Sequence, residues 1–392
     1  MTTRDARDMT TKPHDLVLAN ARIVLADRVI ESGWLAVADG RLAEVGEGRA
    51  PERGEDLGGD LVMPGLIELH TDHIEAHYVP RPKVYWSPVG AVVSYDGQLA
   101  TSGITTVLDS LRVWLEEGAE DVNGQAEILA QAIGEARDAD LLRVDHFLHL
   151  RCEVPMPSVV EEAAGLIGRA DVKLASLMDH TPGQRQFRDE SKLRDYYRGK
   201  GNLTDAELDA LFAKRFEYQA AYAADNYARI VALAREHRTP LASHDDTTLE
   251  HVEQAVRDGV AIAEFPTTID AAERLHGAGI RVLMGAPNLV RGGSHAGNVA
   301  TVDLAERGVL DVLSSDYVPA SLLMAALMLP QRAPNIDLAA AVRTVSKTPA
   351  AAVGLDDRGE IAAGKRADLI HVRVAHDVPM VRTVWQNGRR VA

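Results

Sequence analysis

Short apolar runs alternate with amphipathic stretches through the middle of the chain. The helical patterns of residues 126–136, 206–238 and 248–258 separate such runs. A parallel strand needs a crossover, usually a helix, so this alternation predicts a parallel α/β sheet. Eight strand–helix units close a (β/α)8 barrel, and we expect this TIM-like fold. The runs lie at 61–68, 104–108, 141–150, 172–178, 240–243, 260–265, 280–284 and 309–313.

An open, doubly wound sheet is the alternative to a barrel. Such sheets often carry a Gly-x-Gly-x-x-Gly turn after the first strand, where a dinucleotide binds. No such motif follows the first apolar run of this chain. The missing motif weakens the dinucleotide-binding interpretation and favours the closed barrel.

Both ends of the chain have a different pattern. They contain short apolar runs separated by turn formers, including Asp39-Gly40 and Asn387-Gly388, which favour tight hairpins. Because few strands bury little surface by themselves, we expect the two ends to form one small β-sandwich domain together. The predicted parts are a disordered leader over 1–14, a β domain from 15–60 plus 357–392, and a catalytic barrel over 61–356.

Composition and charge narrow the possible partners. Hydrophobic residues make up 46% of the 392 residues, enough for a large core. Lys and Arg number 42 against 58 Asp and Glu, and the net charge of −16 disfavours nucleic acid or an anionic membrane as partner. The single cysteine, Cys152, excludes an intramolecular disulfide and favours a cytoplasmic location. No apolar run reaches the roughly 18 residues of a membrane-spanning helix.

His and carboxylate side chains recur where five of the expected strands end. His70 and Asp72 follow the first strand two residues apart, so both point to the same side of it. Barrel active sites lie at the carboxyl ends of the strands, and nitrogen and oxygen ligands suit a divalent metal ion. This recurrence predicts a metal site. Its other members are His180, His244, Glu264 and Asp316.

Each of these residues also has a simpler interpretation. A single His after a strand is more often a hydrogen-bonded loop residue, and an Asp there often caps the next helix. Asp245 and Asp246 precede a helix expected to begin near Leu249, which favours a capping role for them. Only the repetition across several strands favours the metal site.

Several motifs resemble those of a known family. Met63-Pro64-Gly65-Leu66-Ile67-Glu68-Leu69-His70 is similar to the first-strand signature of the amidohydrolase superfamily, and residues 359–370 are similar to its closing pattern. Within that superfamily, residues 68–82, 177–184 and 286–298 resemble the PhnM family of phosphonate catabolism. The wider superfamily has His-x-His in the first strand, where this chain has His70-Thr71-Asp72.

The resemblance implies a metal-dependent hydrolase of the carbon–phosphorus lyase pathway. By this resemblance the enzyme is a diphosphatase that cleaves α-D-ribose 1-methylphosphonate 5-triphosphate to the 5-phosphate and pyrophosphate. One or two divalent ions, most simply zinc or manganese, are expected, and Asp316 is implied as the general base. The expected metal ligands are His70, Asp72, His180, His244 and Glu264.

A polyphosphate also needs donors. Phosphate sites in barrels often use the loops after strands seven and eight, and consecutive glycines let backbone N–H groups approach an anion. Basic residues after the first and fourth strands are further candidates. The predicted substrate-binding residues are Arg81, Lys83, Arg185, Asn288, Arg291, Gly292, Gly293, Ser294 and His295.

Two other functions stay open at this point. A C–N hydrolase, such as a cyclic amidase or a deaminase, could use the same barrel without needing the basic loop residues. A non-catalytic relative would keep the barrel for assembly and would have lost several metal ligands, a loss that the sequence does not show. Assembly into a homo-oligomer is possible in each case.

Overall fold

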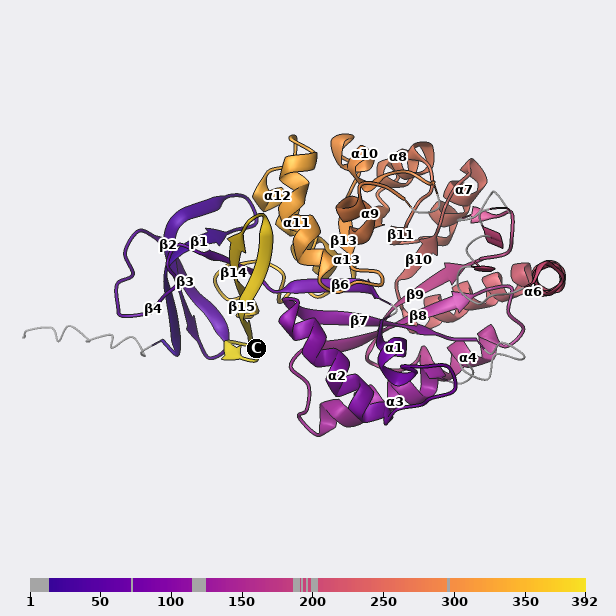
Figure 1. The fold of residues 1–392 in the computed structure, drawn as a ribbon, viewed down its shortest axis with the longest axis horizontal. Coiled ribbons are helices and arrows are strands. Elements are labelled where there is room, and N and C mark those ends of the chain that lie inside the picture. The colour runs from indigo at the N-terminus through magenta and orange to yellow at the C-terminus, as the bar shows by residue number, and fades with distance from the viewer. Residues whose placement is uncertain are drawn as a thin grey trace, which may run out of the picture.

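The computed structural model contains two eight-stranded sheets (Figure 1). It describes residues 14–71, 73–114, 125–185, 191, 193–194, 197–198, 204–294 and 297–392. Nearly all of the expected leader, 1–13, lies outside the described residues. Strands from both ends of the chain share one sheet, and the other sheet is the barrel.

The sheet built from the two ends is mixed. Its strand order is β16-β15-β14-β5-β1-β2-β3, with β4 paired to β1. β1 and β2 contribute buried apolar residues, among them Leu18, Ile23, Leu35 and Val37, to a small core of their own. The strands are β1 (Leu16–Val24), β2 (Val29–Ala38), β3 (Arg41–Glu47), β4 (Glu55–Asp56), β5 (Leu61–Pro64), β14 (Leu369–Ala375), β15 (Val378–Gln386) and β16 (Arg389–Arg390).

The barrel sheet runs β6 to β13 in chain order, and every pair in it is parallel. The expected alternation and the TIM-like fold are confirmed. The strands are β6 (Leu66–Thr71), β7 (Ile104–Arg112), β8 (Asp145–Glu153), β9 (Val172–Met178), β10 (Leu241–His244), β11 (Ile262–Glu264), β12 (Arg281–Gly285) and β13 (Val312–Ser314).

Helices cover the outer face of the barrel (Figure 1). Because the strands are enclosed on both faces, β6 is buried at every residue, as parallel strands usually are. None of the helices in the described ranges is long and apolar enough to span a bilayer. The helices are α1 (Ile74–Tyr78), α2 (Pro88–Thr101), α3 (Gln125–Asp138), α4 (Val159–Leu166), α6 (Asp205–His237), α7 (Leu249–Asp258), α8 (Ile269–Gly277), α9 (Ala286–Arg291), α10 (Thr301–Glu306), α11 (Ser321–Arg332), α12 (Leu338–Arg343) and α13 (Lys347–Ala352).

The first apolar run, 61–68, belongs to both sheets, although we expected a single barrel strand. Its first part, β5, pairs with β1 and β14 in the mixed sheet, and its second part, β6, enters the barrel. The change occurs at Gly65, where an added Cβ would lie 2.2 Å from Thr105 Oγ1. Glycine is therefore required where the chain passes from one sheet to the other.

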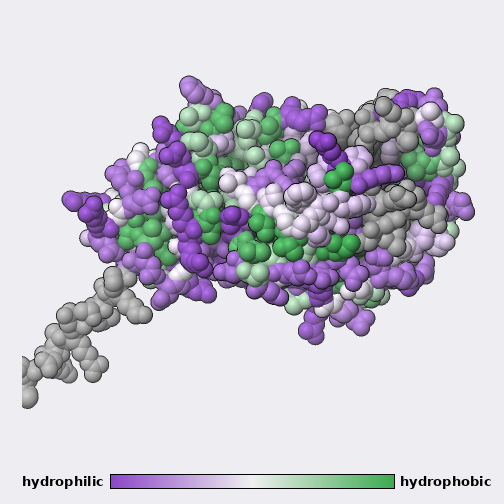
Figure 2. Space-filling model, turned by 60° about the horizontal axis from the view of Figure 1, so that its bottom comes forward, coloured by the Kyte–Doolittle hydropathy of each residue, from purple (hydrophilic) through white to green (hydrophobic). Residues whose placement is uncertain are grey.

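On the face shown in Figure 2, hydrophilic residues are interspersed with apolar patches. This distribution agrees with a chain that carries 26% charged residues and a net charge of −16. The apolar residues that fill the barrel form a separate inner cluster, which includes Ile67, Leu108 and Leu283. They occupy the barrel interior, so the cavity described next is confined to its carboxyl end.

Candidate active site

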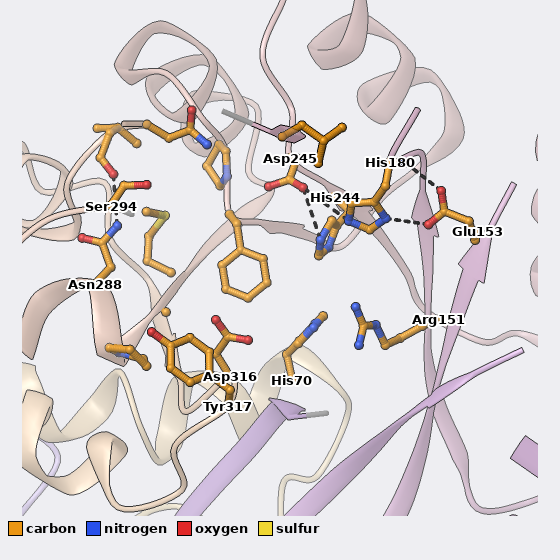
Figure 3. Close-up of a pocket in the computed structure, with 18 of the residues that line it drawn as sticks. His70, Arg151, Glu153, His180, His244, Asp245, Asn288, Ser294, Asp316 and Tyr317 are labelled. Atoms are coloured by element: carbon orange, nitrogen blue, oxygen red, sulfur yellow. Dashed lines mark hydrogen bonds and ion pairs between the residues drawn. The ribbon is translucent and has the colours of Figure 1, made fainter. Parts of the chain in front are cut away.

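A cavity of about 670 Å³ lies at the carboxyl ends of the barrel strands. His70, Glu153, His180 and His244 project into it together with Asp316 (Figure 3). The strand ends therefore bring together side chains that are far apart in the sequence, as the predicted barrel requires.

His70, His244 and Glu264 form the first group that could hold a metal ion. One donor atom from each lies within 4.8 Å of the others. Glu264 joins the two imidazoles, because its Oε1 lies 2.9 Å from His70 Nδ1 and its Oε2 lies 3.0 Å from His244 Nδ1. Burial lowers the pKa of His244 to about 3. Its imidazole is therefore neutral, which is the form that binds metal ions.

His180, His244 and Asp245 form a second such group, which shares His244 with the first. Asp245 Oδ2 is 3.4 Å from His244 Nε2 and 3.8 Å from His180 Nε2. This oxygen is buried and has no hydrogen-bond partner within the part of the chain that the structure describes. Burial raises the pKa of Asp245 to about 7. A cation bound here would satisfy the oxygen and stabilise the carboxylate, so the donor set fits a metal ion.

Glu153 fixes the orientation of His180. Its carboxylate accepts the backbone N–H of His180 at 2.7 Å, and its other oxygen lies 2.6 Å from His180 Nδ1. Burial favours protonation of Glu153, but the His180 side chain outweighs it and lowers the pKa of Glu153 to about 2. Burial likewise opposes the charge on His180, but Glu153 raises the pKa of His180. Such a carboxylate behind a histidine sets the direction of the free Nε2.

Four of the five predicted metal ligands thus lie together, and the fifth, Asp72, lies outside the described residues. The structure adds Asp245, which we interpreted as a helix cap. That interpretation is wrong, because the N-cap of α7 is Thr248, whose side chain accepts the N–H of His251 at 3.4 Å. Asp245 itself has φ +54° and lines the cavity.

Asp316 lies at the seam where β13 meets β6. Its backbone N–H donates to His70 O at 3.2 Å, and a single bridge between Thr71 and Asp316 closes the barrel there. The buried carboxylate of Glu68 reinforces the seam by accepting the N–H groups of His70 at 2.8 Å and Ser315 at 2.6 Å. Glu68 therefore fixes the distance between His70 and Asp316.

The predicted substrate-binding residues divide into two sets. Asn288, Arg291, Gly293 and Ser294 line the cavity. Gly292 ends α9 with φ +83° and does not line the cavity. His295 lies outside the described residues.

The other predicted contacts, Arg81, Lys83 and Arg185, are not among the residues that line the cavity. Arg81 and Lys83 are exposed. Arg185 Nη1 donates to His244 O at 2.6 Å and to Asp246 Oδ1 at 3.0 Å, so it supports the loop that follows β10. Its described contacts are therefore to the segment that carries His244 and Asp245.

Sequence reasoning missed three arginines that line the cavity, Arg112, Arg151 and Arg215. Arg112 is the last residue of β7, and Arg151 lies two residues before the end of β8. The two arginines are register partners in these neighbouring strands. The signal was present, since Arg151 lies two residues after the inward-facing His149 and two before Glu153. Trp114 and Tyr317 also line the cavity without having been predicted.

Comparisons with known proteins agree with this arrangement. The amidohydrolase family profile matches residues 96–392. The chain is 44% identical, over 96% of its length and 100% of the relative, to the α-D-ribose 1-methylphosphonate 5-triphosphate diphosphatase of Escherichia coli (strain K12).

Solved structures share the fold at low sequence identity. A 5-methylcytosine deaminase from Klebsiella pneumoniae aligns with a TM-score of 0.65 at 14% identity, covering 96% of this chain and 98% of that one. A molinate hydrolase aligns with a TM-score of 0.64 at 14% identity, covering 96% of this chain and 94% of that one. At this level of identity the likeness concerns the fold.

Proposed function

The chain belongs to the amidohydrolase family, and we propose that it is a metal-dependent diphosphatase that hydrolyses α-D-ribose 1-methylphosphonate 5-triphosphate to the 5-phosphate and pyrophosphate. The proposal rests on one observation. A single cavity is lined by residues of both groups that could hold a metal ion, by Asp316 and by Arg291. The relative that matches over its full length is a diphosphatase for this triphosphate.

We expect one or two divalent ions, most simply zinc or manganese, to be held by His70, His180, His244, Asp245 and Glu264, with Asp72 as a further candidate. When bound, such an ion supplies positive charge for a phosphoryl oxygen and Lewis acidity towards water. The chain's own contribution is a fixed donor set. Glu153 orients His180, and Glu264 orients both His70 and His244.

Asp316 is the proposed general base. An added Cβ on Gly285 would lie 3.7 Å from Asp316 Oδ2, so the carboxylate faces the end of β12. Asn288 and Ser294, which line the cavity, follow this strand in the sequence. It therefore lies between the histidine cluster and the loop proposed to hold the substrate. From there its carboxylate can accept the proton of the attacking water.

The segment after β12 is the proposed contact for an anionic group of the substrate. It comprises α9 and the residues up to Ser294, and it is here called the β12 loop. Arg291 offers a guanidinium, which pairs well with phosphate or phosphonate oxygens. Asn288 is held in place because its Oδ1 accepts the N–H of Thr301 at 2.9 Å and its Nδ2 donates to Val299 O at 3.2 Å. Gly293, with φ +154°, leaves the backbone open to a ligand.

The proposal is tested by metal-dependent release of pyrophosphate from the triphosphate. The protein is treated with a chelator and then reloaded with zinc or manganese. Activity should vanish and return, and His244→Gln should prevent its return by removing the ligand shared by both groups. His276→Gln is the matched control, because His276 lies on α8 beside Asp311 and outside the cavity.

Hydrolysis of an amide without any release of pyrophosphate would contradict the proposal and favour the C–N hydrolase. A well-folded protein with no bound metal and no metal-dependent activity would favour the non-catalytic alternative. A cytoplasmic location and a homo-oligomeric state remain predictions.

A further inference from the structure

Three arginines from three different elements line the cavity, and this set is here called the arginine wall. Arg112 ends β7, Arg151 lies on β8 and Arg215 lies on α6. Arg151 is only 8% exposed, and its side chain extends into the cavity towards His70 (Figure 3).

The arginine wall adjoins the metal-binding groups. Glu153, the partner of His180, is on the same strand as Arg151, and Arg215 Nη1 lies 3.5 Å from Sδ of Met156, three residues beyond the end of that strand. Arg112 is held from outside by Glu75, whose Oε2 lies 3.2 Å from Arg112 Nε. The wall is thus fixed in position beside the place where we expect the reacting phosphoryl group.

The β12 loop lines another part of the same cavity and offers fewer positive charges. Arg291 is the cationic residue of this loop that lines the cavity, and its neighbours Asn288, Gly293 and Ser294 are neutral. The cavity therefore has two regions that could accept anions, one with three arginines and one with a single arginine. The proposed substrate also has two anionic ends, a triphosphate and a phosphonate, of which the triphosphate carries more charge.

We propose that Arg112, Arg151 and Arg215 bind the pyrophosphate leaving group, and that the β12 loop, with Arg291, binds the phosphonate end. This inference rests on the proposed function. Water attacks the α-phosphorus and forms a new P–O bond, while the bond from that phosphorus to the α–β bridging oxygen breaks. The electron pair of that bond leaves with pyrophosphate, and the water proton goes to the Asp316 carboxylate.

The arginine wall suits a leaving group of this kind. Guanidinium groups can bind phosphate oxygens through two parallel N–H bonds, and their charge persists at every relevant pH. Negative charge grows on the bridging oxygen as the bond breaks, so donors fixed beside it stabilise the transition state. Arg151, the most buried of the three, is expected to contact this oxygen, with Arg112 and Arg215 on the outer phosphates.

The test measures the binding of inorganic pyrophosphate and, separately, of methylphosphonate to the metal-loaded protein by calorimetry. Arg151→Gln and Arg215→Gln should each weaken pyrophosphate binding by about 10- to 100-fold, because each removes a charged hydrogen-bond donor. Both should leave methylphosphonate binding within about threefold of the original value. Arg291→Gln is the matched control and should give the reverse pattern.

Metal content and thermal melting are measured for every variant, so that weaker binding caused by loss of metal or of the fold is not mistaken for loss of an arginine contact. If Arg151→Gln does not fold, the half-buried Arg215 on α6 still provides the measurement. Unchanged pyrophosphate binding in the arginine-wall variants, or a larger loss in Arg291→Gln, would overturn the inference. If the expected binding pattern is found but the triphosphate is not hydrolysed, the proposed function fails and the pyrophosphate subsite remains.

Discussion

His146 and His149 lie three residues apart on β8, both fully buried, yet they favour opposite protonation states. His146 lies on the outer face of the barrel, where its Nδ1 is 2.8 Å from Asp109 Oδ2 and its Nε2 is 3.5 Å from Asp96 Oδ1. Burial opposes its charge, but the two carboxylates outweigh burial and raise the pKa of His146 to about 9. Burial lowers the pKa of His149, on the inner face, to about 4.

The difference shows that the neighbouring groups, and not burial alone, decide whether a buried histidine is charged. Two acids keep His146 charged, so it joins β7, β8 and α2 as an ion-pair partner. His149 lies 3.7 Å from one carboxylate, that of Glu264, which does not outweigh burial, and it bonds to Ser176 Oγ at 2.7 Å and to Leu69 O at 3.0 Å. The ion pairs of His146 on the outer face are expected to support stability, whereas His149 and His244 on the inner face are held neutral beside the proposed metal site.

The largest effect is expected on the inner face, at Asp316. Asp316→Asn should keep its metal content and lower kcat by about 10²- to 10⁴-fold, because the amide cannot accept the water proton. Steady-state kinetics and metal analysis on the same sample check this. An unchanged kcat would remove Asp316 from the role of general base.

A smaller loss of activity is expected at Glu68, beneath the inner cluster. Glu68→Gln replaces one carboxylate oxygen with an NH2 group, so only one of the N–H groups of His70 and Ser315 keeps its acceptor. Turnover should fall by about tenfold as His70 and Asp316 lose their fixed separation. If kcat stays unchanged while stability falls, Glu68 is a purely structural residue.

On the outer face the expected effect is on stability. His146→Gln removes the charged partner of Asp109, while Asp96 keeps its ion pair with Arg143, and should lower the free energy of unfolding by about 1–3 kcal/mol. Denaturant unfolding measures this, and kcat of the folded variant should stay within about twofold of the original. A large loss of kcat with unchanged stability would reverse the roles given to the two faces.

The smallest expected effect is the contribution of His146 to the pH dependence of the free energy of unfolding. Its folded pKa of about 9 lies above the ordinary value of 6.5, so the folded state binds the proton more tightly. The stabilisation is fully present below pH 6.5 and is lost as the pH rises through 9.

The difference in unfolding free energy between the original protein and His146→Gln should therefore shrink between these two pH values. Asp96, Asp109, Tyr95 and Arg143 face His146 and are the same in both proteins. A difference that stays constant from pH 6 to about 10 would mean that His146 is neutral in the fold.

The sequence was sufficient to predict the barrel and four clustered residues that could hold a metal ion, because apolar alternation and strand ends are local features. The division of residues 61–68 between two sheets was not predicted, since both parts have the same apolar pattern and only the close packing at Gly65 separates them. Arg81, Lys83 and Arg185, which we predicted to bind the substrate, are not among the residues that line the cavity, because closeness to a strand end does not fix the direction of a loop side chain.

The most direct test of the account follows the oxygen of the attacking water. The metal-loaded protein hydrolyses the triphosphate in ¹⁸O-labelled water, and ³¹P NMR locates the label in the products. Attack at the α-phosphorus, with Arg112, Arg151 and Arg215 holding the departing pyrophosphate, predicts the label in the 5-phosphate alone. Label in the pyrophosphate, or release of orthophosphate in its place, would contradict it.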